Sequence, residues 1–180
     1  MKGKNQRVLI YGEPILHNKT KPVKKIDITI QKIIADLKET MMYQDGLGLA
    51  ANQIGEAVSI FTFNPRGVNI DQDPKAVINP EIITAEGEEE KEEACLSLPG
   101  IVEMLLRPHK VMIRGISEDG KKIQITGLGL LARVFQHEID HLNGIFFVDH
   151  LSPTRRKMLK KQLDELINRS KLESKKKIEK

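Results

Sequence analysis

The chain has 180 residues, of which 39% are hydrophobic and 30% charged, and its formal net charge is +4. This balance is typical of one water-soluble globular domain, and the apolar runs are too short for a membrane span. The apolar stretch from Val8 to Tyr11 is too small for a signal-peptide core, and a lone cysteine, Cys95, excludes an internal disulfide framework. We therefore expect a single domain over residues 1–180 in the cytoplasm, without a membrane partner.

The first half of the chain predicts one helix followed by short strands. The helix is capped by Asp27 or Thr29 and ends before Asp45-Gly46; its apolar positions are Ile30, Ile33, Ile34, Leu37 and Met41. Strands are predicted at 57–63, 76–83, 101–106, 110–116 and 122–126. The last two form a hairpin through Glu118-Asp119-Gly120. Residues 86–93 include six glutamates and predict an exposed loop.

Helical periodicity returns in the second half. One helix begins near Leu130 and ends at Asn143-Gly144. A second begins at Ser152-Pro153 and frays into Lys175-Lys176-Lys177; its apolar stripe is Met158, Leu159, Leu163, Leu166 and Ile167. The predicted fold class is α+β, with mainly antiparallel sheets around a central helix and a C-terminal helix.

The positive charge is concentrated at the C-terminus. Residues 155–180 hold 11 Lys and Arg against 4 Asp and Glu, a net +7, which leaves −3 for the rest of the chain. Such a segment suits a polyanion such as RNA, although a lysine-rich helix that is merely solvated explains the same pattern. Nothing in the sequence indicates specific DNA recognition.

The segment Gln136 to His141 (QHEIDH) contains an HExxH pattern on the predicted central helix. Residues four apart share one helix face, so His137 and His141 can bind one ion while Glu138 lies beside it as a base for a water molecule. A chance match on a solvated helix is the alternative, but the histidines continue the apolar face of Leu130 and Val134. The pattern therefore predicts a metal-dependent hydrolase.

A catalytic site of this kind needs a third protein ligand. Among the remaining candidates, His17, His109 and His150 have no setting that recommends them. Cys95 follows the acidic stretch and can complete a Cys-His-His set as a thiolate. A buried inert thiol and a catalytic nucleophile are the alternatives for this cysteine.

Three segments in order closely resemble the signature motifs of the peptide deformylases: 46–53 (GLGLAANQ), 93–97 (EACLS) and 136–144 (QHEIDHLNG). The resemblance extends from Arg7 to about Pro153. It implies that Cys95, His137 and His141 bind one divalent metal ion, typically Fe²⁺, with Zn²⁺, Ni²⁺ or Co²⁺ as other occupants. The implied reaction is removal of the formyl group from the N-terminal methionine of nascent bacterial or organellar polypeptides, with release of formate.

The same resemblance assigns further roles. Glu138 is the implied general base and acid, and the Gln53 amide and Leu96 backbone N–H stabilise the oxyanion. The segment around Gly46 and Gly48 pairs with the substrate backbone as with an added strand. The methionine pocket is implied to contain Leu47, Leu130, Val134, the stem of Arg133 and the ring of His137. In some relatives the C-terminal helix docks on the ribosome, and the resemblance therefore implies the ribosome as a candidate partner of residues 155–180.

Two positions depart from the family pattern. Ala94 replaces the usual glycine of EGCLS, and Val102 stands where many relatives have a basic residue near the far end of the substrate. We expect Ala94 to be tolerated and Val102 to alter the affinity for peptides or the preference among them. Four polar residues are expected to surround the metal ligands: Glu93, Arg107, Gln136 and Asp140.

Three other functions compete with this interpretation. An HExxH metalloprotease uses the same water chemistry, but it takes a third ligand downstream, where His150 and three acids (Asp149, Asp164 and Glu165) have no recognisable pattern. A weakly active deformylase-like paralogue fits the two departures. A nucleic-acid-binding module with a structural metal would need four closed protein ligands, and the sequence offers three.

Overall fold

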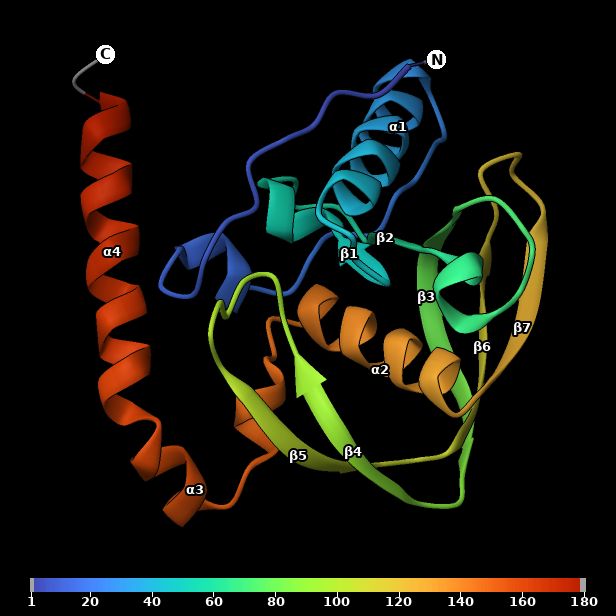
Figure 1. The fold of residues 1–180 in the computed structure, drawn as a ribbon. Helices are drawn as coiled ribbons and strands as arrows, with labels where there is room; N and C mark the ends of the chain where they lie inside the picture. Colours follow the sequence, from blue (N-terminus) through green and yellow to red (C-terminus); the bar gives the residue numbers. More distant parts are fainter. Residues whose placement is uncertain (1, 179–180) are drawn as a thin grey trace.

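The structure is a computed structural model that describes residues 2–178, with side chains through Ser174. Its helices and strands (Figure 1) are α1 (Ile28–Tyr43), β1 (Gly48–Ala50), β2 (Ile60–Phe63), β3 (Lys75–Glu86), β4 (Glu89–Ala94), β5 (Val102–Arg107), β6 (Lys110–Ile116), β7 (Lys122–Leu128), α2 (Leu130–Leu142), α3 (Pro153–Met158) and α4 (Lys160–Ile178). An antiparallel five-stranded sheet has the order β1-β2-β3-β6-β7, and β4 pairs with β5 separately. The α+β class with antiparallel sheets and a C-terminal helix is as predicted.

The two faces of the larger sheet carry different helices. Side chains alternate along a strand, so Phe61 and Phe63 pack with Phe135 of α2, whereas Ile60 packs with Ile33 of α1. Helix α2 also passes beside the β4–β5 ribbon, as Figure 1 shows. It is therefore enclosed by strands from both sheets, which removes most of its side chains from solvent.

The predicted helix and hairpin of the first half are present. Asp27 caps α1, since its carboxylate accepts the backbone N–H groups of Thr29 and Ile30. Strands β6 and β7 form the predicted hairpin: they pair from Ile116 and Lys122, next to the turn, to Lys110 and Leu128 at the far end. The predicted strand at 57–63 begins only at Ile60, and the one at 76–83 extends in both directions to form β3.

The prediction of an exposed loop at 86–93 is wrong. Residues 89–94 form β4, which pairs with β5 over its whole length, from Glu89 with Arg107 to Ala94 with Val102. Most of the glutamates still face solvent, but Glu93 is buried against arginine side chains. Ladder hydrogen bonds and buried counter-charges together overcome the low strand propensity of this sequence.

The predicted C-terminal helix is divided in two. Ser152 caps α3 through its hydroxyl, which accepts the N–H of Arg155, and Leu159 separates α3 from α4. Leu159, Leu163 and Leu166 are buried against the body, but Met158 is 79% exposed and lies outside the stripe. The backbone of α4 is helical through Ile178, and the side chains of 175–177 lie outside the described residues. Within the described part, no helix is long and apolar enough to cross a membrane.

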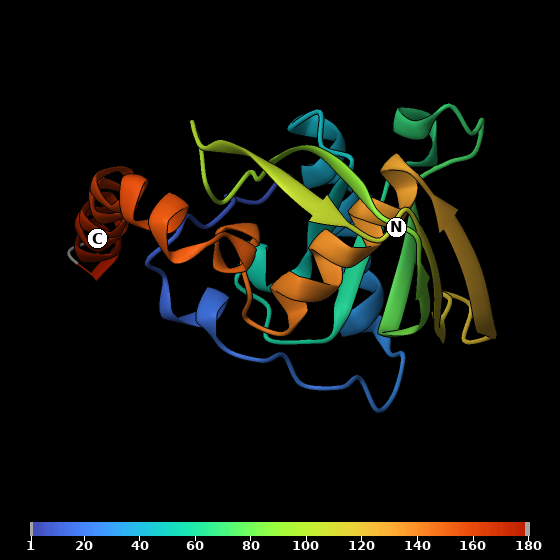
Figure 2. The same cartoon turned by 90° about the horizontal axis from the view of Figure 1, so that it is seen from below.

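An N-terminal segment, residues 4–23, runs along one side of the molecule and contains a short 3-10 helix at Pro14–His17 (Figure 2). Its backbone N–H groups bind carbonyl oxygens from three distant parts of the chain. Leu9 donates to Gln53 at 2.7 Å, Tyr11 to Ser97 at 2.8 Å, and Thr20 to the last residue of α2, Leu142, at 2.8 Å. The segment thereby joins all three of the sequence motifs from one side.

Candidate metal centre

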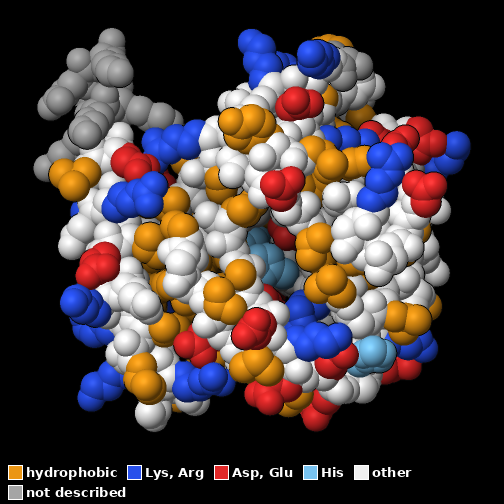
Figure 3. Space-filling model, in the orientation of Figure 1, with side chains coloured by type: hydrophobic (Ala, Val, Ile, Leu, Met, Phe, Trp, Pro, Cys, Tyr) orange, Lys and Arg blue, Asp and Glu red, His pale blue; other side chains and the backbone are white. Residues whose placement is uncertain are grey.

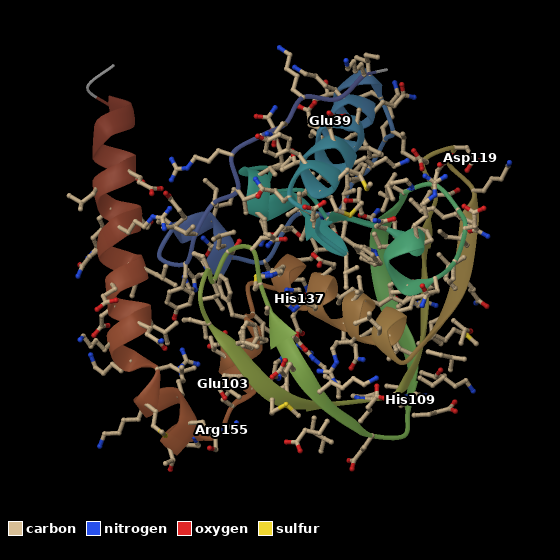
Figure 4. All side chains as sticks on the ribbon, viewed as in Figure 1. Glu39, Glu103, His109, Asp119, His137 and Arg155 are labelled. Atoms are coloured by element: carbon tan, nitrogen blue, oxygen red, sulfur yellow. The ribbon has the colours of Figure 1, made fainter. Side chains whose placement is uncertain are left out.

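Helix α2 brings the HExxH residues into the interior. His137 and His141 are one turn apart on the same face, with ring centroids 4.7 Å apart. This part of the helix is largely shielded from solvent, since Glu138 is 3% exposed and His141 is 1% exposed. In Figure 4, His137 lies near the centre of the molecule, beside the end of β4. The histidines are thus on the buried side of α2 that the sequence predicted.

Cys95 follows β4 directly and meets the two histidines. Its Sγ lies 3.1 Å from Nε2 of His141, which lies 3.1 Å from Nε2 of His137. All three atoms lie within 4.8 Å of one another. Tetrahedral coordination with usual metal–nitrogen and metal–sulfur lengths separates ligand atoms by about 3.3–3.6 Å. The spacing of these atoms is close to that of one mononuclear site.

The hydrogen bonds of His137 also fit a metal ligand. Its Nδ1 lies 2.7 Å from Oε1 of Glu93, so Nδ1–H donates to the carboxylate and Nε2 keeps its lone pair. Burial lowers the pKa of His141 well below its usual value, which leaves that imidazole neutral. Burial has the same tendency at His137, but the hydrogen bonds with Cys95 and Glu93 outweigh it and raise the pKa of His137 well above its usual value. The bond to Glu93 directs Nε2 of His137 toward the ring of His141.

Glu93 is held in a buried network of cations. Arg107 donates to both of its oxygens, at 3.0 and 2.7 Å, and Arg133 donates to Oε2 at 3.0 Å. Burial opposes ionisation of Glu93, but the hydrogen bonds from His137 and Arg107 outweigh it and hold the pKa of this carboxyl well below its usual value. Glu93 is consequently an anion that fixes the ring of His137.

The network continues from Arg107 to the surface. Arg107 donates to Asp140 Oδ2 at 2.7 Å, and the same oxygen lies 2.7 Å from Nε2 of His150. Sequence patterns could not predict this contact of His150, because it depends on the fold of the chain after α2. Gln136 takes no part, since its amide donates to the carbonyl oxygens of Pro108 and Ala132.

Gln53 and Ser97 form a second polar group at the centre. Gln53 Oε1 accepts the N–H of Ala50 at 2.8 Å, which turns Nε2 toward Ser97 Oγ at 3.1 Å and Cys95 Sγ at 3.7 Å. The backbone N–H of Ser97 also points at Sγ, at 3.3 Å. Sequence reasoning missed Ser97, although its place two residues after the candidate ligand was a usable signal. Leu96, between them, faces the cavity.

Glu138 and Gly48 are in direct contact. A β-carbon on Gly48 would lie 2.8 Å from both Cγ and Cδ of Glu138, so only glycine leaves room for this carboxyl group. The Oε2 atom of Glu138 is buried without a hydrogen-bond partner among the described residues. Burial raises the pKa of Glu138 to about 7. Such a carboxyl group is suited to accept and return a proton near neutral pH.

A cavity of about 350 Å³ opens onto this centre, and Figure 3 shows it as a hollow with a histidine at its floor. The lining includes every residue expected for substrate binding: Gly46, Leu47, Gly48, Leu130, Arg133 and Val134. The guanidinium of Arg133 turns away toward Glu93 and the carbonyls of Leu105 and Glu89. His17, packed on Tyr11 and Phe146, and His109 are not part of the lining.

Comparison with known proteins gives one consistent result. The sequence profile described as polypeptide deformylase matches residues 5–157. Peptide deformylase of Thermodesulfovibrio yellowstonii is 42% identical over 154 residues, which are 84% of this chain and 92% of the relative. That of Thermotoga petrophila is 40% identical over 158 residues, 87% of this chain and 93% of the relative.

Solved structures agree with the sequence relatives. The crystal structure of a peptide deformylase from Legionella pneumophila superposes with a TM-score of 0.83 at 40% identity, covering 90% of this chain and 95% of the other. The Ehrlichia chaffeensis peptide deformylase in complex with actinonin gives 0.82 at 31% identity, covering 94% and 98%. The profile, the relatives and the fold all span the cavity and its Cys-His-His group, and the chain belongs to the polypeptide deformylase family.

Proposed function

We propose that this protein is a metal-dependent hydrolase that removes the formyl group from the N-terminal methionine of newly made polypeptides and releases formate. One observation carries the proposal: Cys95, His137 and His141 converge at one point in a cavity that also contains the buried carboxyl of Glu138. These three residues would hold the ion. Because the described residues supply only three donors at this point, and Cys95 and His137 line the cavity, the set suits catalysis better than a closed structural site with four protein ligands.

A divalent ion in this position supplies Lewis acidity, which lowers the pKa of water and polarises the formyl carbonyl. Thiolate and imidazole donors accept Fe²⁺, Zn²⁺, Ni²⁺ and Co²⁺ alike. Fe²⁺ is the proposed occupant, on the basis of the resemblance to this family. Glu93 and Arg107 keep the ring of His137 oriented, whichever ion is bound.

Glu138 performs the proton transfers. Its carboxylate accepts a proton from the water that attacks the formyl carbon, and it then donates this proton to the methionine nitrogen as the carbon–nitrogen bond breaks. The contact with Gly48 and the absence of a competing donor within the described structure keep Oε2 available for this role. Formate and a free N-terminal amine are the products.

Charge that develops on the formyl oxygen is stabilised by two donors. The Gln53 amide is held by Ala50, which leaves an Nε2–H directed toward the cavity near Cys95. The Leu96 backbone N–H is the second donor, at the residue directly after the ligand. Both are positioned before the reaction, which is the condition under which such donors lower a barrier most.

Strand β1 supplies the peptide-binding edge. It is the outermost strand of the larger sheet and pairs only with β2 among the described strands, so its second edge is available to an extended peptide. Gly46 and Gly48 line the cavity on this side. The methionine side chain would occupy the part of the cavity formed by Leu47, Leu130, Val134, the stem of Arg133 and the ring of His137. Backbone pairing explains how one site serves many different polypeptides.

The departure at Ala94 is compatible with activity. Ala94 is not among the residues with positive φ, and it pairs with Val102 in regular register. A methyl group is therefore accommodated without strain beside Cys95. This supports an active enzyme over a weakly active paralogue.

The test is anaerobic purification followed by metal analysis and measurement of formate released from formyl-Met-Ala-Ser. We expect about one metal ion per chain and formate release that stops when the ion is chelated. An internally cleaved peptide without formate would instead identify a metalloprotease. A chain that binds stoichiometric metal and yields neither product would refute the hydrolase.

We further propose that residues 1–180 act as one catalytic domain in the bacterial cytoplasm and that residues 155–180 contact the ribosome. The support is the net charge of +7 on this segment and the exposed position of α4 beside the body. Cosedimentation with ribosomes, before and after deletion of 155–180, tests the contact. A control variant that changes only the buried leucines of this segment would show whether loss of packing, and not loss of charge, reduces ribosome binding. Equal ribosome binding by the full chain and by the deletion would exclude the contact.

A further inference from the structure

We propose that Asn52 is a positioning residue for the metal ligand His141, and that its side-chain oxygen and Nδ1 of His141 together bind one buried water molecule. The inference rests on the proposed function, because it concerns the metal site of that function. Asn52 belongs to the first sequence motif, but the reaction described above gives it no task. Its side chain is fully buried, which is a costly place for an amide group that lacks partners.

Two of the three proposed metal ligands have a polar partner that holds them. Glu93 lies 2.7 Å from Nδ1 of His137. The backbone N–H of Ser97 points at Sγ of Cys95, at 3.3 Å. By contrast, Nδ1 of His141 is buried without a hydrogen bond to any residue whose side chain the structure describes. When Nε2 of a neutral imidazole binds an ion, the ring proton is on Nδ1, and ligating histidines almost always donate it to an acceptor.

Asn52 lies beside His141 and has an unused acceptor. It belongs to a short 3-10 helix, Ala51–Ile54, which packs against α2. Its Nδ2 donates to the backbone carbonyl of His141 at 2.5 Å, whereas its Oδ1 is buried without a hydrogen-bond partner in the described part of the chain. One pair of contacting residues thus contains both a buried donor and a buried acceptor that are unpaired, and each of them costs free energy.

One water molecule can satisfy both atoms. An amide oxygen only accepts hydrogen bonds, so the water donates to Oδ1 of Asn52 and accepts from Nδ1–H of His141. Buried waters typically make about 2–4 bonds of this kind to polar groups that would otherwise be unpaired. The bridge fixes the orientation of the His141 ring, as Glu93 fixes the ring of His137. It therefore holds Nε2 of His141 in its place, 3.1 Å from Sγ of Cys95.

A simpler role for Asn52 is to cap the end of α2. The carbonyl of His141, however, already accepts the backbone N–H of Gly144 at 3.0 Å. The next carbonyl, that of Leu142, accepts both the N–H and the hydroxyl of Thr20, at 2.8 and 2.9 Å. Because the end of α2 has these other donors, capping alone does not explain a buried amide at position 52. Thr20 also supplies a matched control, since its hydroxyl binds the neighbouring carbonyl at the same helix end.

The experiment compares Asn52→Leu, which keeps the size and removes both polar atoms, with Thr20→Val, which removes only the hydroxyl. Both should lower the Tm of the metal-free protein, because each deletes a buried hydrogen bond to α2. Asn52→Leu should also reduce the affinity for Zn²⁺ about tenfold or more in a titration against a chelator, whereas Thr20→Val should bind Zn²⁺ as the wild type does. Asn52→Ser, which keeps a hydroxyl for the water, should lose only about threefold.

Two measurements on the zinc-loaded wild-type enzyme need no variant that folds. A crystal structure should show one water within about 3.2 Å of both Oδ1 of Asn52 and Nδ1 of His141. Proton–nitrogen NMR spectra should show the His141 ring protonated at Nδ1, with cross-relaxation between this proton and a bound water.

Wild-type zinc affinity in Asn52→Leu, or an equal loss of affinity in Thr20→Val, would overturn the inference. So would a crystal structure in which Oδ1 of Asn52 and Nδ1 of His141 bind other protein groups. In each of these cases the proposed function still stands, provided that the wild-type enzyme binds zinc and releases formate. A wild-type chain that binds no zinc would instead count against the metal site and the proposed function.

Discussion

The carboxyl group of Glu138 lies against the α-carbon of Gly48, so the proposed proton carrier on α2 is positioned by the edge strand β1. The contact joins the first sequence motif to the third. It gives Gly48 a steric role in addition to its proposed place along a peptide-binding edge.

Gly48→Ala should displace Glu138 and lower kcat by at least about 10²-fold, because the general base would move from its position. Metal content should remain normal, since the three ligands are not touched. Gly46→Ala is the matched control variant. Its added β-carbon would lie 3.4 Å from the nearest atoms, an ordinary contact distance, so the loss of kcat should be much smaller. Steady-state kinetics with metal analysis distinguish these results, and equal losses in the two variants would argue against the steric role.

Glu138→Gln should keep the fold and the metal but lose at least about 10²-fold in kcat, roughly 3 kcal/mol of barrier. The amide preserves shape and cannot accept the proton. Measured formate release should therefore fall while the metal-to-protein ratio stays constant. Retention of wild-type kcat would show that another group carries the proton.

Removal of the ion should destabilise the protein, because the ligands are brought together only in the folded state. At a metal concentration near 100 times the dissociation constant, binding contributes about 2.7 kcal/mol, which corresponds to a fall in Tm of roughly 5–10 °C after chelation. Calorimetry with and without chelator measures this fall in Tm. In Cys95→Ser the chelator should have a much smaller effect, since the thiolate ligand is missing; a full effect would remove Cys95 from the site.

Arg107→Met should be strongly destabilising, by about 3–5 kcal/mol, because it leaves Glu93 and Asp140 without their shared buried cation. Metal affinity should fall roughly 10- to 100-fold as the ring of His137 loses its oriented partner. Arg114→Met breaks an exposed pair with Glu81 and should cost less than about 1 kcal/mol. Denaturant unfolding and metal titration compare the two, and similar costs would show that burial of the network contributes little.

Much of the fold could be read from local patterns. The capped helix after Asp27, the β6–β7 hairpin and the amphipathic α2 each depend on residues that are close in sequence. The strand β4 could not be read this way. Its six-residue ladder with β5 and the burial of Glu93 depend on Arg107 and Arg133, which are distant in sequence, and local charge density indicated a loop instead.

The metal centre shows the same division between features that are local in sequence and features that depend on distant residues. The HExxH spacing was enough to place His137 and His141 on one helix face. Three other features arise from tertiary packing: the 3.1 Å distance between Cys95 Sγ and His141 Nε2, the hydrogen bond between His150 and Asp140, and the hydrogen bond from Gln53 to Ser97. Residue type and order can suggest such partners, but only the folded chain determines which of them meet.

The N-terminal segment has a consequence for how the enzyme matures on its own ribosome. Residues 9, 11 and 20 are made well before the residues whose carbonyl groups they bind, which are Gln53, Ser97 and Leu142. The last of these leaves the exit tunnel only after most of the chain has been translated. Contacts of such long sequence separation form late in folding. The N-terminal segment therefore cannot make all three hydrogen bonds until helix α2 has been translated, so its packing against the three motifs is completed after that point.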